Sequence, residues 1–382
     1  MGHIMSAKGW WCHTAVLCLL LGSILDAKES SRVPYTVDSL LSNKTRLIAG
    51  YSQIDNRNYS KLGIGFNFGF GKLTQVDIEP AAYFPAGAGE PSVYVNVKEI
   101  SFEIDNLVGF QWGRLTDLTI AQGGLMDRFD SGSGVSGSDY NPHKAGTWGF
   151  VELSALHLEG FLTSRGLYGG YGAYKLGTIP VLDVPMKVGA AYIRDPLAPL
   201  TSVESGYSTD VSLLLSGDMI VLYSEYARLN NHGDGTSIGL KGNVLDIVNY
   251  RLAYRMNNAD FLPGYFGPGY EQSAPVLPTE KSTSTVAGIG SAWLGGMVKT
   301  DIQAEFFPEY TVMITGVGIK PILGMAAVAH YTKPFGSTTA FPSLEAQAYI
   351  PMGMLAPLIG IKQVYGPITD TSYTLGISVN LI

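Results

Sequence analysis

Large apolar residues alternate with small or polar residues in many segments of this chain. In residues 62–71, within the segment 61–72, one set of alternate positions is entirely apolar, and the positions between are glycine or asparagine. The same period of two recurs in residues 373–381 at the end of the chain. Successive side chains of a strand point to opposite faces of its sheet. The pattern therefore predicts β-strands with one apolar face and one nearly bare face. The apolar positions are Leu62, Ile64, Phe66, Phe68 and Phe70 in the first segment and Tyr373, Leu375, Ile377, Val379 and Leu381 in the second.

Two further segments place charged residues together on one face. In residues 248–256 the arginines Arg251 and Arg255 occupy the polar positions, and in residues 298–306 these positions carry charges of both signs. In these two predicted strands the face opposite the apolar one is therefore charged. Weaker alternation recurs at 45–54, 92–104, 185–193, 219–229, 236–242, 311–319, 323–331, 343–350 and 358–364.

A soluble β-sandwich also alternates, but its polar face meets water and usually carries solubilising charge. Here the polar faces are rich in glycine and small residues, and the segments continue through the chain without a linker. A sheet in lipid must close, because an open edge would leave backbone groups unpaired. We therefore expect an all-β fold, a closed antiparallel up-and-down transmembrane β-barrel over residues 45–382. We expect about 18 strands, within a range of 16–20 that depends on whether runs such as 148–163 are split.

The connections between these segments differ in length. Four long ones, at 116–147, 195–206, 257–283 and 332–342, all follow odd-numbered segments in the most generous count. Tight turns follow the even-numbered ones. Long and short connections at opposite rims are typical of outer-membrane barrels, which have short periplasmic turns and longer external loops.

The first 44 residues differ in character from the rest. Lys8 is followed by a mostly apolar stretch from Trp10 to Leu25, which predicts a signal peptide over residues 1–27. An uncleaved membrane anchor is the alternative. Residues 28–44 are then expected to form an N-terminal periplasmic segment.

Composition excludes several classes of function. Only 15% of residues are charged, the net charge is −7, and no cluster of Lys and Arg suggests a nucleic-acid partner. Both cysteines, Cys12 and Cys18, lie in the first 20 residues, which excludes thiol chemistry elsewhere. No two histidines have metal-ligand spacing, and no nucleotide-binding motif is present, so neither a metal nor a cofactor is expected. We do not expect an enzyme. A hydrolase that uses His157 or His330 as base is the least favoured alternative.

In architecture, residues 45–382 resemble bacterial outer-membrane β-barrel proteins of the porin type. The resemblance implies a channel for passive diffusion of small hydrophilic solutes or ions, surrounded by the lipid bilayer of a bacterial outer membrane. About 18 strands would enclose an aqueous channel, whereas about 8 would be filled by side chains. A structural or adhesive barrel with a plugged lumen is the alternative function. Assembly as a homo-oligomer is left open.

Three sets of residues are candidates for the site. The charged strand faces are expected to line the pore, unless their charges only pair with one another to stabilise the wall. The region 123–143 resembles the constriction loop of porins, with a surface loop as the alternative. The aromatic residues of 257–271 are expected to pack over the mouth or to form a solute track. The pore-lining candidates are Arg251, Arg255, Lys299, Asp301, Gln303, Glu305 and Lys241; the constriction candidates are Asp127, Arg128, Asp130, Asp139 and Tyr140; the mouth-loop aromatics are Phe261, Tyr265, Phe266 and Tyr270.

Overall fold

The computed structural model describes most of the chain from Lys44 onward. The expected signal peptide (1–27) and all but the last residue of the expected periplasmic segment (28–44) lie outside the described residues. Within the described part, no helix is long and apolar enough to cross a membrane. The described residues are 44–54, 57–70, 74–87, 90–104, 107–115, 118–129, 131, 145–179, 184–198, 203–245, 247–267, 270, 275, 277–293, 297–308, 311–322, 325–335, 343–350, 355–364 and 370–380.

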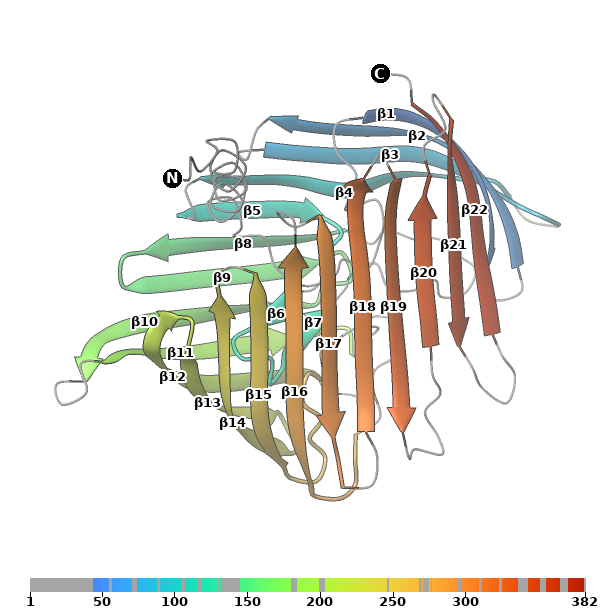
Figure 1. Cartoon of the computed structure of the whole chain (residues 1–382). Helices are drawn as coiled ribbons and strands as arrows, with labels where there is room; N and C mark the ends of the chain where they lie inside the picture. Colours follow the sequence, from blue (N-terminus) through green and yellow to red (C-terminus); the bar gives the residue numbers. More distant parts are fainter. Residues whose placement is uncertain are drawn as a thin grey trace, which may run out of the picture.

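Twenty strands form one sheet in which each strand pairs antiparallel with its neighbours along the chain (Figure 1). The ring strands are β1 (Lys44–Ile54), β2 (Arg57–Phe70), β3 (Thr74–Pro85), β4 (Ser92–Ile104), β5 (Val108–Gly113), β8 (Gly146–Leu153), β9 (Leu156–Thr163), β10 (Tyr168–Ile179), β11 (Val184–Arg194), β12 (Ser205–Asp218), β13 (Val221–Leu229), β14 (Asp234–Val244), β15 (Val248–Asn257), β16 (Ser282–Trp293), β17 (Val298–Phe306), β18 (Thr311–Ile322), β19 (Met325–Phe335), β20 (Ser343–Tyr349), β21 (Leu355–Val364) and β22 (Asp370–Asn380).

The sheet closes on itself because the last strand pairs with the first. β22 runs antiparallel to β1, with Ala49 opposite Ile377. Closure leaves no sheet edge, as a lipid environment requires. The predicted fold, a closed antiparallel β-barrel, is therefore confirmed. Its 20 strands fall within the expected range and exceed the central figure of 18. The run 148–163 contains both β8 and β9, joined by the turn at Ser154 and Ala155, where neither glycine nor proline marks a break.

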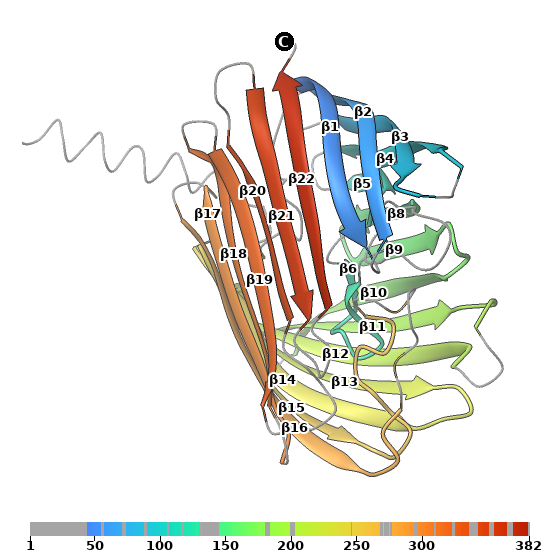
Figure 2. The ribbon, with the colours of Figure 1, turned by 90° about the vertical axis from the view of Figure 1, so that its right-hand side faces the viewer.

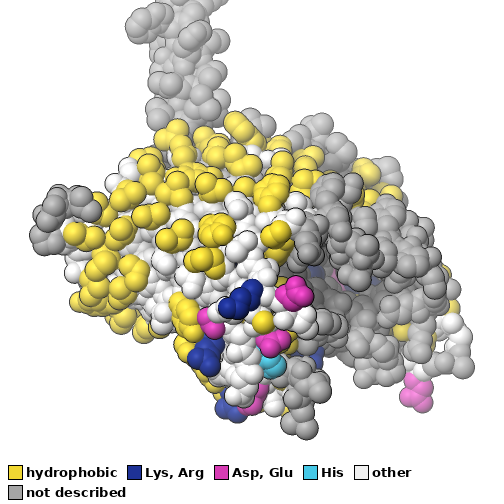
Figure 3. Space-filling model, turned by 90° about the horizontal axis from the view of Figure 1, so that it is seen from below, with side chains coloured by type: hydrophobic (Ala, Val, Ile, Leu, Met, Phe, Trp, Pro, Cys, Tyr) yellow, Lys and Arg dark blue, Asp and Glu magenta, His cyan; other side chains and the backbone are white. Residues whose placement is uncertain are grey.

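The outer face of the ring is apolar. Leu252 of β15, Ile302 of β17 and Ile377 of β22 are 52%, 50% and 54% exposed, although each lies in the middle of a paired strand. In Figure 3 hydrophobic side chains spread over the outer wall, and most of the charged side chains gather in one smaller region. Such a continuous apolar surface, on a closed sheet, is typical of a barrel that spans a membrane.

The two rims of the barrel differ in the length of their connections, as expected. The long connections after β5, β11, β15 and β19 lie at one rim, and the opposite rim has turns as short as two residues between β8 and β9 and between β12 and β13. The long connection after β5 contains two short strands outside the ring, β6 (Leu118–Ile120) and β7 (Met126–Phe129). In both Figure 1 and Figure 2 these strands lie inside the barrel.

Candidate constriction site in the barrel lumen

A hairpin built from β6 and β7 fills part of the lumen. The two strands pair antiparallel through Leu118 with Phe129 and Ile120 with Met126. The turn between them lies against the wall strand β13: a Cβ atom at Gly124 would be 2.6 Å from Oε2 of Glu225 and 3.0 Å from Cβ of Ala227. A side chain at this position would require the end of Glu225 to shift and would lie in tight contact with Ala227, so glycine suits this close approach. We refer to residues 118–129 as the constriction hairpin.

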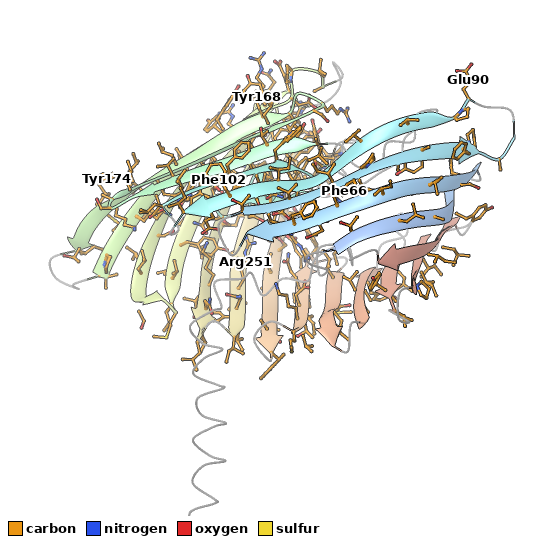
Figure 4. All side chains as sticks on the ribbon, turned by 90° about the horizontal axis from the view of Figure 1, so that it is seen from above. Phe66, Glu90, Phe102, Tyr168, Tyr174 and Arg251 are labelled. Atoms are coloured by element: carbon orange, nitrogen blue, oxygen red, sulfur yellow. The ribbon has the colours of Figure 1, made fainter. Side chains whose placement is uncertain are left out.

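Arg251 of β15 connects this hairpin to the wall. Its Nη1 donates to Oδ2 of Asp127 at 3.2 Å, and its Nη2 donates to the carbonyl oxygen of Gln122 at 2.5 Å. Its Nε donates to the hydroxyl of Tyr223, also on the wall, at 3.2 Å. Figure 4 shows Arg251 toward the middle of the barrel and Tyr174 at its periphery. One guanidinium thus binds both arms of the turn.

A second ion pair joins the hairpin to β17. Nη1 of Arg128 lies 3.2 Å from Oδ2 of Asp301, and both side chains are almost completely buried. Arg128 has a positive φ of 58°, which is uncommon for a residue other than glycine. Thr119 holds the neighbouring backbone, because its hydroxyl donates to Asp127 and accepts from the Arg128 amide, each at 3.1 Å. The hairpin is therefore held in a defined geometry from both sides.

Three wall residues that the sequence interpretation missed complete the contact. Gln122 donates from Nε2 to Asp210 at 3.1 Å and to Ser212 at 3.3 Å. Asp210 lies directly opposite Glu225 in the β12–β13 ladder, and both carboxylates are buried under the turn. The signal was present: polar residues occupy the alternate positions 208, 210 and 212 of β12.

A third pair lies on the wall itself. Arg255 of β15 donates from Nη1 to both carboxylate oxygens of Glu305, at 3.0 and 3.1 Å. Ser284, on the strand between them, donates to the same carboxylate at 2.7 Å. This pair stabilises the wall and at the same time places charge on the lumen side.

The mouth-loop aromatics pack onto the constriction hairpin. Phe261, Tyr265, Phe266 and Tyr270 are all buried in one apolar cluster with hairpin residues such as Leu125. Two backbone hydrogen bonds join the segments, from Phe266 to the Leu125 carbonyl at 3.0 Å and from Gly264 to that of Gly124 at 2.9 Å. Because these rings are buried against one another and against the hairpin, they form no continuous stacking track, and the geometry favours packing over a solute track.

The remaining candidates are distributed as follows. Nζ of Lys241 lies 5.7 Å from the ring centroid of Tyr223, Lys299 is buried, and Gln303 is half-buried beside Gly288 on the inner face. Asp130, Asp139 and Tyr140 lie outside the described residues.

The histidine of the hydrolase alternative has carboxylate neighbours. His157 Nδ1 lies 2.6 Å from Oε2 of Glu152, and its ring lies beside those of Phe150 and Tyr171. The side chain of His330 lies outside the description. In the part of the chain that is described, no group of His, Cys, Asp and Glu residues could hold a metal ion.

Comparisons with known proteins return only distant likenesses. No family model and no curated protein matches the chain. Similar solved structures include a mutant of the Rh. blastica porin (10% identity, 88% of this chain and 99% of that chain, TM-score 0.31). Another is the outer membrane protein opdK from Pseudomonas aeruginosa (10% identity, 88% of this chain and 98% of that chain, TM-score 0.40). A third is a BenF-like porin from Pseudomonas fluorescens Pf-5 (9% identity, 88% of this chain and 97% of that chain, TM-score 0.41). At these identities no residue role or solute is transferred, and the barrel assignment is based on the strand pairing itself.

Proposed function

We propose that this barrel is a channel of a bacterial outer membrane through which ions and small hydrophilic solutes diffuse passively. The observation that carries the proposal is the Arg251 contact with Asp127 and Gln122, because it fixes a narrowing element inside a closed ring. The apolar outer face suits lipid, and the inner face carries charges of both signs. Fixed charges that line a narrow passage bias which ions and solutes pass.

The inner wall supports a selective rather than a neutral passage. Arginines of β15 lie beside carboxylates of β17 and of the constriction hairpin, so positive and negative charges face one another across short distances. Such a field orders water and dipolar solutes, whereas apolar solutes gain no electrostatic stabilisation from it. The pore-lining role of Arg251, Arg255, Lys241, Lys299, Asp301, Gln303 and Glu305 is part of this proposal.

Ion currents through the purified full-length chain in planar bilayers test the proposal. Gln303 is neutral and half-buried on the inner face, so it accepts a charge of either sign without loss of an ion pair. We expect Gln303→Lys to shift the reversal potential toward anions and Gln303→Glu to shift it toward cations. The two variants control for each other, since both change size and polarity in a similar way. Absence of any ion current in the unaltered protein would reject the channel.

A further inference from the structure

A cavity of about 520 Å³ lies at the mouth of the barrel, on the rim with the long connections. It is bounded by the two arms of the connection between β15 and β16 and by the turn after β17. The volume falls within the range of small-molecule sites, about 300–1,000 Å³. We call it the mouth cavity. Its lining includes Asn257, Phe261, Leu277, Ser282, Phe307 and Pro308.

The mouth cavity has apolar walls and a polar floor. Phenylalanine, leucine and proline side chains from three different segments form the walls. At the floor, Asn257 at the end of β15 donates to the hydroxyl of Ser282 at the start of β16, at 3.4 Å. The exposed side chains Glu280 and Lys281 add one charge of each sign. A solute that fills this space meets an apolar surface on its sides and polar groups at one end.

The cavity lies on the path toward the charged part of the lumen. Asn257 is two residues beyond Arg255 on the same face of β15, and Ser282 is two residues before Ser284. Ser284 and Arg255 both bind Glu305. A solute held in the cavity is therefore one step, along two adjacent strands, from the first ion pair of the inner wall.

We propose that the mouth cavity binds small zwitterionic solutes that have an apolar body, of which an aromatic amino acid is the simplest example. The apolar body packs against the Phe, Leu and Pro walls, and the ammonium and carboxylate groups face Glu280, Lys281 and the polar floor. A small polyol makes no apolar contact with the walls that stabilises it, and a pure hydrocarbon forms no hydrogen bond with the floor and no ion pair with Glu280 or Lys281. The inference depends on the proposed channel and adds a solute class to it.

Single-channel recordings with two amino acids test this inference. L-phenylalanine, added on the long-connection side, is expected to interrupt the current in a concentration-dependent manner, and L-serine, which has the same charges but no apolar body, is not. Pro308→Trp fills the cavity from an exposed turn and is expected to weaken block by at least about tenfold, the loss that corresponds to about 1.4 kcal/mol. Pro196→Trp, at an exposed proline of another connection on the same rim, is the matched control.

Ser282→Phe fills the same cavity from its floor and replaces Pro308→Trp if that variant does not insert. Equal block by serine and phenylalanine would overturn the inference, as would undiminished block in the filled variants. In both cases a normal ion current leaves the proposed channel standing. Loss of all current in the unaltered protein would instead remove the channel itself.

Discussion

The guanidinium of Arg251 on β15 lies 3.2 Å from the carboxylate of Asp127, a residue 124 positions earlier in the chain. Because the same side chain also binds the Gln122 carbonyl, it connects the wall to both arms of the turn in the constriction hairpin. A long-range contact of this kind holds an inserted element only while its charge and its geometry are both intact. Arg251 is therefore one of the wall residues that fix the position of the hairpin, together with Asp301 and Asp210.

Arg251→Gln removes the charge-assisted hydrogen bonds to Asp127, to the Gln122 carbonyl and to Tyr223, and leaves the Asp127 carboxylate without this partner. Breaking a largely buried pair on one side costs about 3–5 kcal/mol. We expect the hairpin to move away from the wall, with a larger mean conductance and more current noise in planar bilayers. Arg194→Gln, which removes an exposed pair with Glu204 outside the lumen, should leave the current unchanged. The same conductance in both variants would argue against the connecting role of Arg251.

A disulfide between the hairpin turn and the wall reports directly on insertion. A Cβ atom at Gly124 would lie 3.0 Å from that of Ala227, slightly less than the 3.5–4.5 Å or so found in disulfides. With Cys12 and Cys18 replaced by serine, Gly124→Cys with Ala227→Cys should cross-link in intact membranes under mild oxidation. Leu222→Cys, on the outer face of the same strand, should not cross-link with Gly124→Cys. Failure of the first pair, seen as unchanged gel mobility, would place the hairpin elsewhere.

The apolar cluster between mouth loop and hairpin sets the stability of the mouth. Phe266 is 0% exposed and packs edge-on against Tyr265 and Tyr270. Phe266→Ala should cost about 3–5 kcal/mol of local stability and make the loop more sensitive to protease at temperatures where the barrel stays folded. Phe306→Ala, at a lipid-facing position, serves as control. Equal protease sensitivity in both variants would contradict the packing role.

The mouth loop should also loosen at alkaline pH. The Tyr270 hydroxyl donates to Asp195 at 3.0 Å, and burial together with that carboxylate raises the pKa of Tyr270 above its ordinary value of about 10. In the open loop the Tyr270 hydroxyl has its ordinary pKa of about 10. In the closed loop its pKa is higher, so the hydroxyl stays protonated above pH 10. The closing free energy is thus fully present below pH 10 and falls as the pH rises above it.

Limited digestion with a protease active in alkali, at pH 8 and at pH 10.5, measures this effect. The unaltered loop should be cleaved faster at the higher pH, beyond the change in protease activity. Tyr270→Phe should abolish that increase, and Tyr254→Phe, on the outer face, should retain it. If the increase persists in Tyr270→Phe, another group is responsible.

The sequence predicts those features of the barrel that depend on neighbouring residues, and it does not predict contacts between residues far apart in the chain. Alternation in segments such as 248–256 predicted the strand, its outward side and the lumen side of Arg251, because a strand's faces depend only on local spacing. The partner of Arg251 could not be predicted, since Asp127 reaches it through the fold of a loop with no periodic pattern. Gln122 was missed for the same reason. Asp210 and Glu225 lie on strands, and the alternation of polar residues at 208, 210 and 212 could have identified the inner face of β12. The strand pair within 148–163 was left unresolved because its turn contains neither glycine nor proline.

Residue-by-residue accessibility along β17 tests the central account most directly, since this strand carries both the apolar outer stripe and the charged inner one. Spin labels at single cysteines would be measured in lipid bilayers against oxygen, which concentrates in lipid, and against a water-soluble nickel complex. The account predicts oxygen-dominated relaxation at Ile302 and Ala304 and nickel-dominated relaxation at Gln303 and Glu305. The reverse pattern, or no alternation, would contradict a lipid-facing outer wall around a hydrated lumen.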